Sequence, residues 1–217
     1  SLGRIMQSKV KVAVDAMGGD HSPGEIVKGA VDAVNERGEV EVFLAGRKEA
    51  VEQELSRYHY PEDRVHVVDA GEVISNDEAP VFAIRTKKDS SIVVALNLVK
   101  KGEADAFVSA GSTGAVLVGA QLIVGRIKGV ERPPLAPLMP TLSGVSLLVD
   151  CGANVDARPS HLVQFAKMGS IYMENVVGIK NPRVAIVNVG VEEEKGNMLV
   201  KETFPLLKNC NEINFIG

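Results

Sequence analysis

The sequence predicts an α/β fold with a mainly parallel sheet, and two observations carry this prediction. Short runs rich in β-branched residues alternate along the chain with longer segments whose apolar residues recur at helical spacing. Several of the short runs are nearly continuous in apolar residues, which is typical of strands that helices cover on both faces. Strands and helices that alternate in this way favour parallel strands joined by right-handed crossovers.

The expected elements follow one another in regular order. Strands are expected at Val10–Asp15, Glu39–Ala45, Arg64–Asp69, Ala104–Ser109, Gly144–Asp150, Arg183–Val189 and Glu212–Ile216. Helices are expected at Gly24–Arg37, Lys48–Tyr58, Ser90–Lys101, Thr113–Val124, Pro159–Val177 and Asn197–Lys208. The segment Lys128–Thr141 is rich in proline, which excludes a regular helix and predicts a long ordered loop.

The composition is that of a folded protein whose core consists mainly of Val, Ile, Leu and Ala. Of the 217 residues, 45% are apolar, 24% are charged and 4% are aromatic, with no Trp. The net charge of -4 argues against a general nucleic-acid binder, whose surface would be basic overall. No apolar run reaches the roughly 18 residues that a membrane span needs. These features predict a soluble, cytoplasmic protein.

The two ends of the sequence suggest a domain boundary and a truncation. Residues 1–9 are expected to be a flexible N-terminus or residues left from protein expression. Residues 10–217 are expected to form one α/β domain. The last expected strand arrives at Gly217, where an open sheet of this class would present ligand-binding residues. We therefore expect an N-terminal portion of a longer protein, incomplete at its C-terminal end.

The first candidate site is the loop that follows the first strand. The strand ends near Asp15, the pair Gly18-Gly19 permits a close turn, and Asp20 and His21 precede a helix start. A strand–glycine–helix junction offers backbone N–H groups to an anion. A purely structural turn is the alternative, although a simple turn would need only the glycines.

The second candidate site has the same design at the end of a later strand. Ser109, Ser112 and Thr113 supply hydroxyl donors, and Gly111 and Gly114 allow a ligand to approach the backbone. The spacing matches neither the dinucleotide-binding fingerprint nor the P-loop, which would also need a lysine. The pattern favours an anion cradle over a capped tight turn.

Further polar residues could complete a site at the same edge of the sheet. Arg85, Lys87 and Lys88 precede a helix start, where cations suit a phosphate-rich ligand, although a solvated face is an equal alternative. Asn154 follows a further expected strand, and Asn188 lies at the end of another. Polar residues at successive strand ends are typical of a shared active-site rim.

The other candidate reactive residues are interpreted as structural. Cys151 follows a buried strand, and core packing is the favoured interpretation because free cysteines are usually buried. His161 lies at a helix start and is interpreted as a helix-terminal polar residue. No metal-binding motif occurs, and the nucleophile elbow of hydrolases is absent. No cofactor and no metal are expected.

The sequence resembles the PlsX-type phosphate acyltransferases over almost its whole length, from about Val10 to Gly217. The resemblance rests on these segments, in family order: Val14–Pro23 with the sequence VDAMGGDHSP, Arg85–Ser91, Val108–Ala115, Asp150–Asn154, Leu162–Ala166 with Met168-Gly169, and Asn188–Gly190 with Glu193–Asn197. The first of these motifs is highly specific, whereas the serine–glycine turn alone would be weak. Members of this family are longer than this chain.

The resemblance implies a three-layer α/β/α fold similar to isocitrate and isopropylmalate dehydrogenases and to phosphotransacetylases. It also implies a homodimer and an acyl transfer from acyl carrier protein to inorganic phosphate, an early step in phospholipid synthesis. Any peripheral membrane contact would come from the missing C-terminal part. A dehydrogenase of the same fold is one alternative, and a module that binds phospho-ligands or carrier protein without turnover is the other.

The chemistry of such a transfer assigns roles to the candidate residues, as hypotheses. Phosphate carries an anionic oxygen near neutral pH, so the site must position it and stabilise an oxyanion. Catalysis is assigned to His21, Asp15 and Lys87. Phosphate binding is assigned to Gly18, Gly19, Asp20, Lys88, Ser109, Gly111, Ser112, Thr113, Gly114, Asn154 and Asn188. An acidic carrier protein should dock on a basic patch, either Arg126, Lys128 and Arg132 or Arg85, Lys87 and Lys88.

Overall fold

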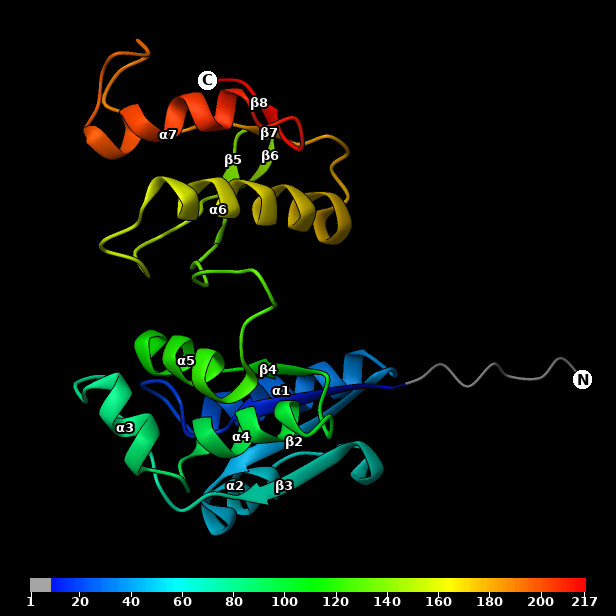
Figure 1. Cartoon of the computed structure of the whole chain (residues 1–217). Helices are drawn as coiled ribbons and strands as arrows, with labels where there is room; N and C mark the ends of the chain where they lie inside the picture. The colour runs from blue at the N-terminus through cyan, green and yellow to red at the C-terminus, as the bar shows by residue number, and fades with distance from the viewer. Residues whose placement is uncertain (1–8) are drawn as a thin grey trace, which may run out of the picture. The chain divides into compact units, whose positions relative to one another are not determined.

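A computed structural model describes residues 9–217 of the chain (Figure 1). The expectation of a flexible or expression-derived N-terminus falls on residues 1–8, which lie outside the described residues. The chain divides into two compact units, one ending at Gly125 and the other comprising Arg126–Gly217. The expectation of one domain over residues 10–217 stays a prediction.

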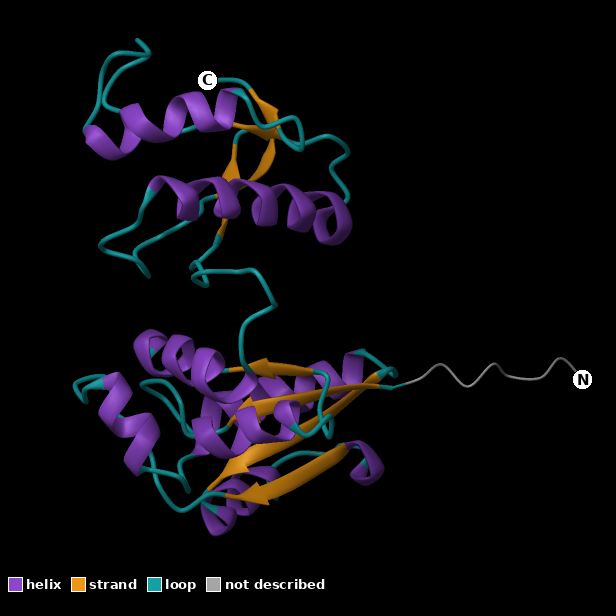
Figure 2. Ribbon diagram, in the orientation of Figure 1, coloured by secondary structure: helices purple, strands orange, loops and turns teal. Residues whose placement is uncertain are grey.

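The first unit is built on a parallel sheet, as the sequence predicted (Figure 2). Its strands, in the spatial order β3-β2-β1-β4, are β3 (Val65–Asp69), β2 (Val40–Gly46), β1 (Val10–Asp15) and β4 (Ala106–Val108). Strand β1 lies in the middle, with Asp15 in register with Ala45 on one side and Val14 in register with Val108 on the other. All three pairings are parallel.

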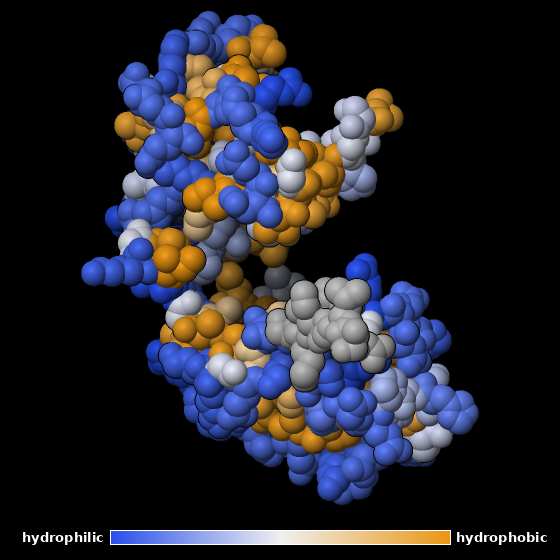
Figure 3. Space-filling view, turned by 90° about the vertical axis from the view of Figure 1, so that its right-hand side faces the viewer, coloured by the Kyte–Doolittle hydropathy of each residue, from blue (hydrophilic) through white to orange (hydrophobic). Residues whose placement is uncertain are grey.

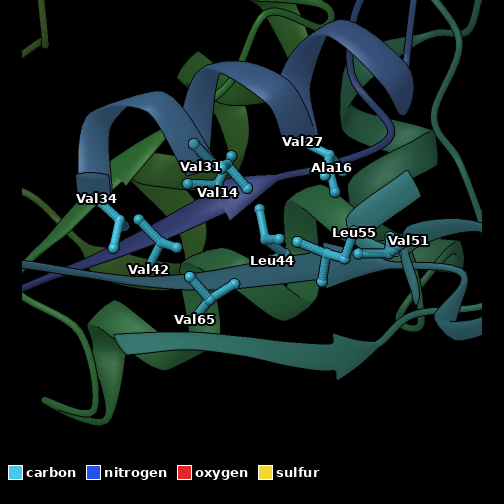
Figure 4. Close-up of a cluster of buried hydrophobic side chains, with 11 residues drawn as sticks. Val14, Ala16, Val27, Val31, Val34, Val42, Leu44, Val51, Leu55 and Val65 are labelled. Carbon is cyan, nitrogen blue, oxygen red and sulfur yellow. The ribbon is translucent and has the colours of Figure 1, made fainter. Parts of the chain in front are cut away.

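Helices cover both faces of this sheet. They are α1 (Gly24–Glu36), α2 (Lys48–Leu55), α3 (Pro80–Thr86), α4 (Ser91–Lys100) and α5 (Thr113–Gly119), with the 3-10 turn η1 (Glu62–Arg64) and the π-helical η2 (Ala120–Val124). Period-two alternation sends Val14 and Ala16 of the first strand region into the cluster drawn in Figure 4, and the partly buried Val12 packs against the same cluster. Each buried valine there stabilises the fold by about 1.5–3 kcal/mol.

The opposite face is packed with small side chains. Ala13 and Ala45 are fully buried against Ala95 and Leu98 of α4. Because alanines leave little volume between the sheet and the helix, α4 lies close to the strands. A third cluster joins α3, α4 and α5, with Ile84, Ile92 and Leu96 buried against Ala115. The α/β class with a mainly parallel sheet is therefore confirmed.

The second unit contains two small sheets and two long helices. The strands β5 (Leu138–Thr141) and β6 (Gly144–Leu147) form an antiparallel hairpin, and β7 (Arg183–Val184) pairs in parallel with β8 (Asn214–Phe215). Helix α6 (Pro159–Tyr172) continues as the π-helical η3 (Met173–Val177), and α7 (Met198–Lys208) follows β7.

Several expected boundaries were wrong. The expected loop Lys128–Thr141 ends in strand β5, because Gly144 adopts a φ of 145° that lets the chain reverse into β6. The expected strands Arg183–Val189 and Glu212–Ile216 shorten to the two-residue strands β7 and β8. Beyond Val184 the apolar alternation persists, and the Ile186 N–H still donates to the Gly217 carbonyl at 3.0 Å, but the regular strand pairing within the described residues is limited to β7 and β8.

The second unit also exposes apolar surface. Val187, Val189 and Val191 are 80%, 86% and 99% exposed, and Figure 3 shows apolar residues gathered on this unit's visible face. A cavity of about 660 Å³ opens between α6 and the segments 145–150 and 182–187, lined largely by apolar side chains. Apolar surface of this extent is normally covered by protein or ligand. In the described part of the chain, every helix is too short or too polar to cross a bilayer.

Candidate functional site

The candidate site lies where the order of the parallel sheet changes direction. From β1 the chain proceeds outward through β2 and β3, and then returns to place β4 on the other side of β1. The loops that leave the carboxyl ends of β1 and β4 therefore start side by side. In open α/β sheets, ligands bind in the crevice at such a switch point. The two glycine-containing loops predicted from the sequence are these two loops.

A chain of hydrogen bonds joins the two loops through Asp15. The Asp15 side chain is only 1% exposed, and its Oδ2 accepts a hydrogen bond of 2.7 Å from the Ser109 hydroxyl. Its Oδ1 accepts from the backbone N–H of Met17 at 3.2 Å. The Ser109 oxygen in turn accepts from the N–H of Gly111 at 3.0 Å. The buried Asp15 carboxylate thus has partners for both oxygens, and the network holds both loops in one arrangement.

The glycines of the two loops allow this close approach. A Cβ built at Gly18 would lie 2.8 Å from the backbone N of Gly111, which real Cβ atoms essentially never do. Gly19 has a φ of 100°, and a Cβ there would lie 3.3 Å from the Cβ of Ala110. Gly18 and Gly111 therefore pack the loops together, while their assigned contact with phosphate stays a prediction.

The second loop ends at a capped helix start. The Ser112 hydroxyl accepts from the N–H of Ala115 at 3.2 Å and so caps α5, which continues into η2 as one helical segment. Within residues 9–217, no protein acceptor receives the N–H groups of Thr113 and Gly114. Thr113 is exposed. These two N–H groups and the Thr113 hydroxyl are among the donors that the loop can offer to an anion.

The first loop presents its polar side chains to solvent. Asp20 and His21 are exposed, and the His21 carbonyl accepts from Glu25 as α1 begins. The carboxylate of Glu54 lies against Gly24, 3.7 Å from where a Cβ would stand, and thus places a negative charge at the start of α1. An anionic ligand is therefore better accommodated at the start of α5 than at the start of α1.

The predicted cations gather at the end of α3, but one of them, Lys87, is paired with a carboxylate. The Lys87 ammonium donates at 2.7 Å to both the Val73 carbonyl and the Glu78 carboxylate. The Lys88 ammonium donates to the Ile84 carbonyl at 3.2 Å. Arg85 is exposed, and in the part of the chain described no carboxylate lies within ion-pair distance of it.

The predicted asparagines belong to the second unit, where both make structural contacts. Asn154 donates through its backbone N–H to Asp150 at 2.7 Å and through its side chain to the Pro133 carbonyl at 3.2 Å. Asn188 donates to the Lys195 carbonyl at 2.9 Å. Their assignment to phosphate stays a prediction.

The remaining reactive residues fit structural roles. His161 is 3% exposed; its Nδ1 accepts from the Arg158 N–H at 3.0 Å, and its Nε2 lies 2.9 Å from the Glu131 carboxylate. It therefore caps the start of α6, as the sequence predicted. Cys151 is half-buried. Among residues 9–217 no cluster of His, Cys, Asp and Glu could hold a metal ion.

Sequence reasoning missed helix α3 and, with it, Glu78 and Pro80. Pro80 is the first residue of α3, and its Cγ would lie 2.8 Å from a Cβ at Gly114, so α3 begins against the first turn of α5. The signal that could have located α3 is a proline at the first helical position followed by Ala83 and Ile84, the only buried pair in the helix.

Comparison with known proteins identifies the family of this chain. The model of the family described as fatty acid synthesis protein matches residues 10–217. The phosphate acyltransferase of Clostridium botulinum (strain Alaska E43 / Type E3) is 55% identical over 208 residues, which are 96% of this chain and 62% of that protein. The putative phosphate acyltransferase of Clostridium perfringens (strain 13 / Type A) is 54% identical over 96% of this chain and 61% of its own length.

The chain belongs to the PlsX-type phosphate acyltransferase family. As a member of this family it spans about three fifths of the length of the relatives quoted above. The residues of the two sheet-edge loops, Asp15–Pro23 and Ser109–Thr113, fall within the matched segment.

Solved structures of two phosphotransacetylases share the fold of this family member. The phosphotransacetylase from Streptococcus pyogenes superposes with a TM-score of 0.68 at 18% identity, covering 96% of this chain and 68% of that one. The EutD phosphotransacetylase from Staphylococcus aureus gives a TM-score of 0.69 at 18% identity, covering 97% and 69%. At this identity the likeness shows the fold alone.

Proposed function

We propose that this chain carries the phosphate-binding part of an enzyme that transfers a fatty acyl group from acyl carrier protein to inorganic phosphate. The observation that supports this most is the junction at the carboxyl ends of β1 and β4, where the Asp15–Ser109 hydrogen bond fixes two loops beside the free N–H groups of Thr113 and Gly114. Membership of the acyltransferase family supports the same reaction.

In this proposal the start of α5 holds phosphate. The N–H groups of Thr113 and Gly114 and the Thr113 hydroxyl donate to its oxygens, and the positive end of the helical segment Thr113–Val124 stabilises its charge. Gly111 and Ala115 contribute no N–H, because theirs already donate to Ser109 and Ser112. Asp15 is a positioning residue, since it is buried and its carboxylate is occupied by Ser109 and Met17.

The reaction needs little proton transfer. An oxygen of the hydrogen phosphate dianion attacks the thioester carbonyl carbon, a C–O bond forms, and the C–S bond breaks as the tetrahedral intermediate collapses. The phosphate proton passes to the departing thiolate, so the products are acyl phosphate and the free thiol. The site accelerates this sequence by alignment and by stabilising the oxyanion, which are the larger contributions in acyl transfer.

His21 is the candidate group for the departing thiolate or the oxyanion. It is exposed on the loop that follows β1, six residues after Asp15, and lies on the same loop as the tightly packed Gly18. An imidazole there is free to turn toward a ligand in the crevice. Lys87 is paired with Glu78 and is assigned a positioning role in place of a contact with phosphate.

The proposal extends to the setting of the reaction. The acyl donor is acyl carrier protein, and the product serves phospholipid synthesis in the cytoplasm. The enzyme is a homodimer with the three-layer fold of the isocitrate dehydrogenase class, and any membrane contact involves parts beyond the segment described. The family match to a fatty acid synthesis protein supports the lipid context.

The docking surface for the acidic carrier is proposed at the end of α3. Arg126 bonds to the Glu131 carbonyl, and Arg132 lies 2.5 Å from the Asp156 carboxylate, so these cations are engaged. Arg85 is exposed and Lys88 has a carbonyl partner only. Reversal of Arg85 and Lys88 to Glu should weaken carrier binding about tenfold at low salt. An equal loss on reversal of Arg126 and Arg132 alone would move the surface to the second unit.

The test is phosphate-dependent release of free thiol from a long-chain acyl carrier protein. This chain is assayed beside a version extended to the length of its relatives, with an acyl-coenzyme A of the same chain length as a second donor. Release from the carrier protein by the extended version supports the proposal. Faster release from coenzyme A would overturn the proposed donor. Binding of phosphate without release by either version would identify a binding module.

A further inference from the structure

The ammonium group of Lys87 has two partners on one loop. It donates at 2.7 Å to the carbonyl of Val73 and at 2.7 Å to Oε1 of Glu78. The side chains of Lys87 and Glu78 are 31% and 27% exposed, so the pair is partly shielded from water. Lys87 follows directly on α3, whereas both acceptors precede that helix. The contact therefore closes the segment Val73–Lys87 on itself.

Glu78 collects further donors at the same oxygen. Its Oε1 accepts from the N–H of Ser75 at 2.9 Å and from the Ser75 hydroxyl at 3.0 Å. The Lys87 ammonium, followed by the Ser75 N–H, lowers the pKa of Glu78 to about 2. The carboxylate is thus ionised throughout the neutral range, and its Oε1 is the common acceptor for the Lys87 ammonium and the two donors of Ser75.

This loop leads directly to the phosphate cradle. Ala79 and Pro80 follow Glu78, and Pro80 contacts Gly114 in the first turn of α5. Behind this contact Ala83 and Ile84 of α3 are buried in the cluster that contains Ala115. A shift of Glu78 would therefore move Pro80 against the turn that carries the free N–H groups.

We propose that Glu78 and Lys87 form a positioning pair that holds α3 against the first turn of α5, in place of a direct contact between Lys87 and phosphate. The inference rests on the proposed function for its catalytic consequence, but the positioning itself is a property of the first unit. The rival is the role predicted from the sequence, in which Lys87 supplies charge to phosphate.

The two roles predict opposite effects of removing the Glu78 charge. If the pair positions α5, Glu78→Gln and Lys87→Met each raise the KM for phosphate about five- to tenfold with kcat within about twofold, and the double variant is no worse than either single one. If Lys87 binds phosphate, Glu78→Gln frees the ammonium and leaves that KM unchanged or lower. Activities are measured by thiol release in the version extended to full length.

The exposed pair Lys28 and Asp32 on α1 is a matched control, because its atoms also lie 2.7 Å apart. Lys28→Met and Asp32→Asn should leave the KM for phosphate unchanged. A KM rise in these controls equal to that in Glu78→Gln would overturn the inference, because the effect would then be unspecific.

Hydrogen exchange tests the positioning without any assay of activity. The amides of Ala115 and Val116, which both donate to Ser112, should exchange about fivefold faster in Glu78→Gln and Lys87→Met than in the parent chain. Unchanged exchange would overturn the positioning pair. Faster exchange in a protein whose full-length parent releases no thiol would support the pair and overturn the proposed function.

Discussion

The Ser109 hydroxyl donates a 2.7 Å hydrogen bond to Oδ2 of Asp15 across 94 residues of sequence. This bond crosses from the end of β4 to the end of β1, and it joins the two loops that enclose the candidate phosphate site. Because Asp15 is buried, its carboxylate depends on Ser109 and on the Met17 N–H for compensation of its lost hydration. The bond is thus a condition for the geometry of the site.

Removal of either partner should therefore cost stability. Ser109→Ala leaves a buried carboxylate oxygen without its donor, and Asp15→Ala leaves the hydroxyl and the Met17 N–H without acceptors. Each change should lower the free energy of unfolding by about 1–3 kcal/mol. The double variant should cost less than the sum, because both changes break one network. Urea unfolding measures all three.

Ser56→Ala is the control for loss of a hydroxyl, since Ser56 is exposed and donates to a backbone carbonyl at 2.7 Å. It should change the free energy of unfolding by less than about 0.5 kcal/mol. Strictly additive losses for Asp15→Ala and Ser109→Ala would contradict the coupling of the two loops.

A methyl group at Gly18 should separate the two loops. The new Cβ would lie 2.8 Å from the Gly111 backbone, which cannot retreat without breaking its bond to Ser109. Gly18→Ala should lower the free energy of unfolding by about 1–3 kcal/mol and reduce thiol release in the full-length protein. Gly29 lies on α1 with open space around it, so Gly29→Ala should instead raise the free energy of unfolding by about 0.5–1 kcal/mol. Equal effects at Gly18 and Gly29 in thermal or urea unfolding would rule out the crowding.

The stabilisation by Glu78 should disappear in acid. Its pKa is lowered from 4.5 to about 2, chiefly by the hydrogen bond from Lys87, so the folded state favours the ionised carboxylate. Stability from this group is fully present above the unfolded pKa and is lost as the pH falls toward 2. The parent should exceed Glu78→Gln in unfolding free energy at pH 7, and the gap should shrink below about pH 4.5.

Urea unfolding of both proteins at several pH values between 7 and 3 measures this gap. Glu36→Gln is the control, because Glu36 is exposed and, in the described part of the chain, has no ion-pair partner. The difference in unfolding free energy between Glu36→Gln and the parent should not change with pH over the same range. A gap for Glu78→Gln that widens in acid would show that the carboxylate is not stabilised in its ionised form.

The sequence predicted the elements whose burial pattern is repeated and local. Val10–Asp15 and the helix from Gly24 were located because alternating valines and apolar residues at helical spacing are determined within a few neighbouring residues. Both candidate loops were also found, because strand–glycine–helix junctions are visible in the sequence. Helix α3 was missed because only Ala83 and Ile84 are buried in it, which is too few to show a period.

The contacts between the elements depended on information that no local pattern contains. That Ser109 donates to Asp15 follows from the placement of β4 beside β1, which the order of the strands in the chain does not determine. The engagement of Lys87 by Glu78 depends likewise on the fold of the loop before α3. A cationic motif predicts an anion partner, and here the partner found is a carboxylate of the same chain.

His21 provides the sharpest separation of chemistry from folding. The imidazole is exposed and makes no hydrogen bond within residues 9–217, so His21→Ala should leave the free energy of unfolding within about 0.5 kcal/mol of the parent. If His21 stabilises the oxyanion or the departing thiolate, kcat for thiol release should fall about 100-fold or more, with the KM for phosphate little changed. Stopped-flow thiol detection on the full-length protein measures both constants.

His59→Ala is the control, because this histidine lies outside the two loops that follow β1 and β4, and it should keep full activity. Full turnover by His21→Ala would assign the oxyanion to backbone donors alone, and the first loop would then serve only to pack Gly18 against Gly111.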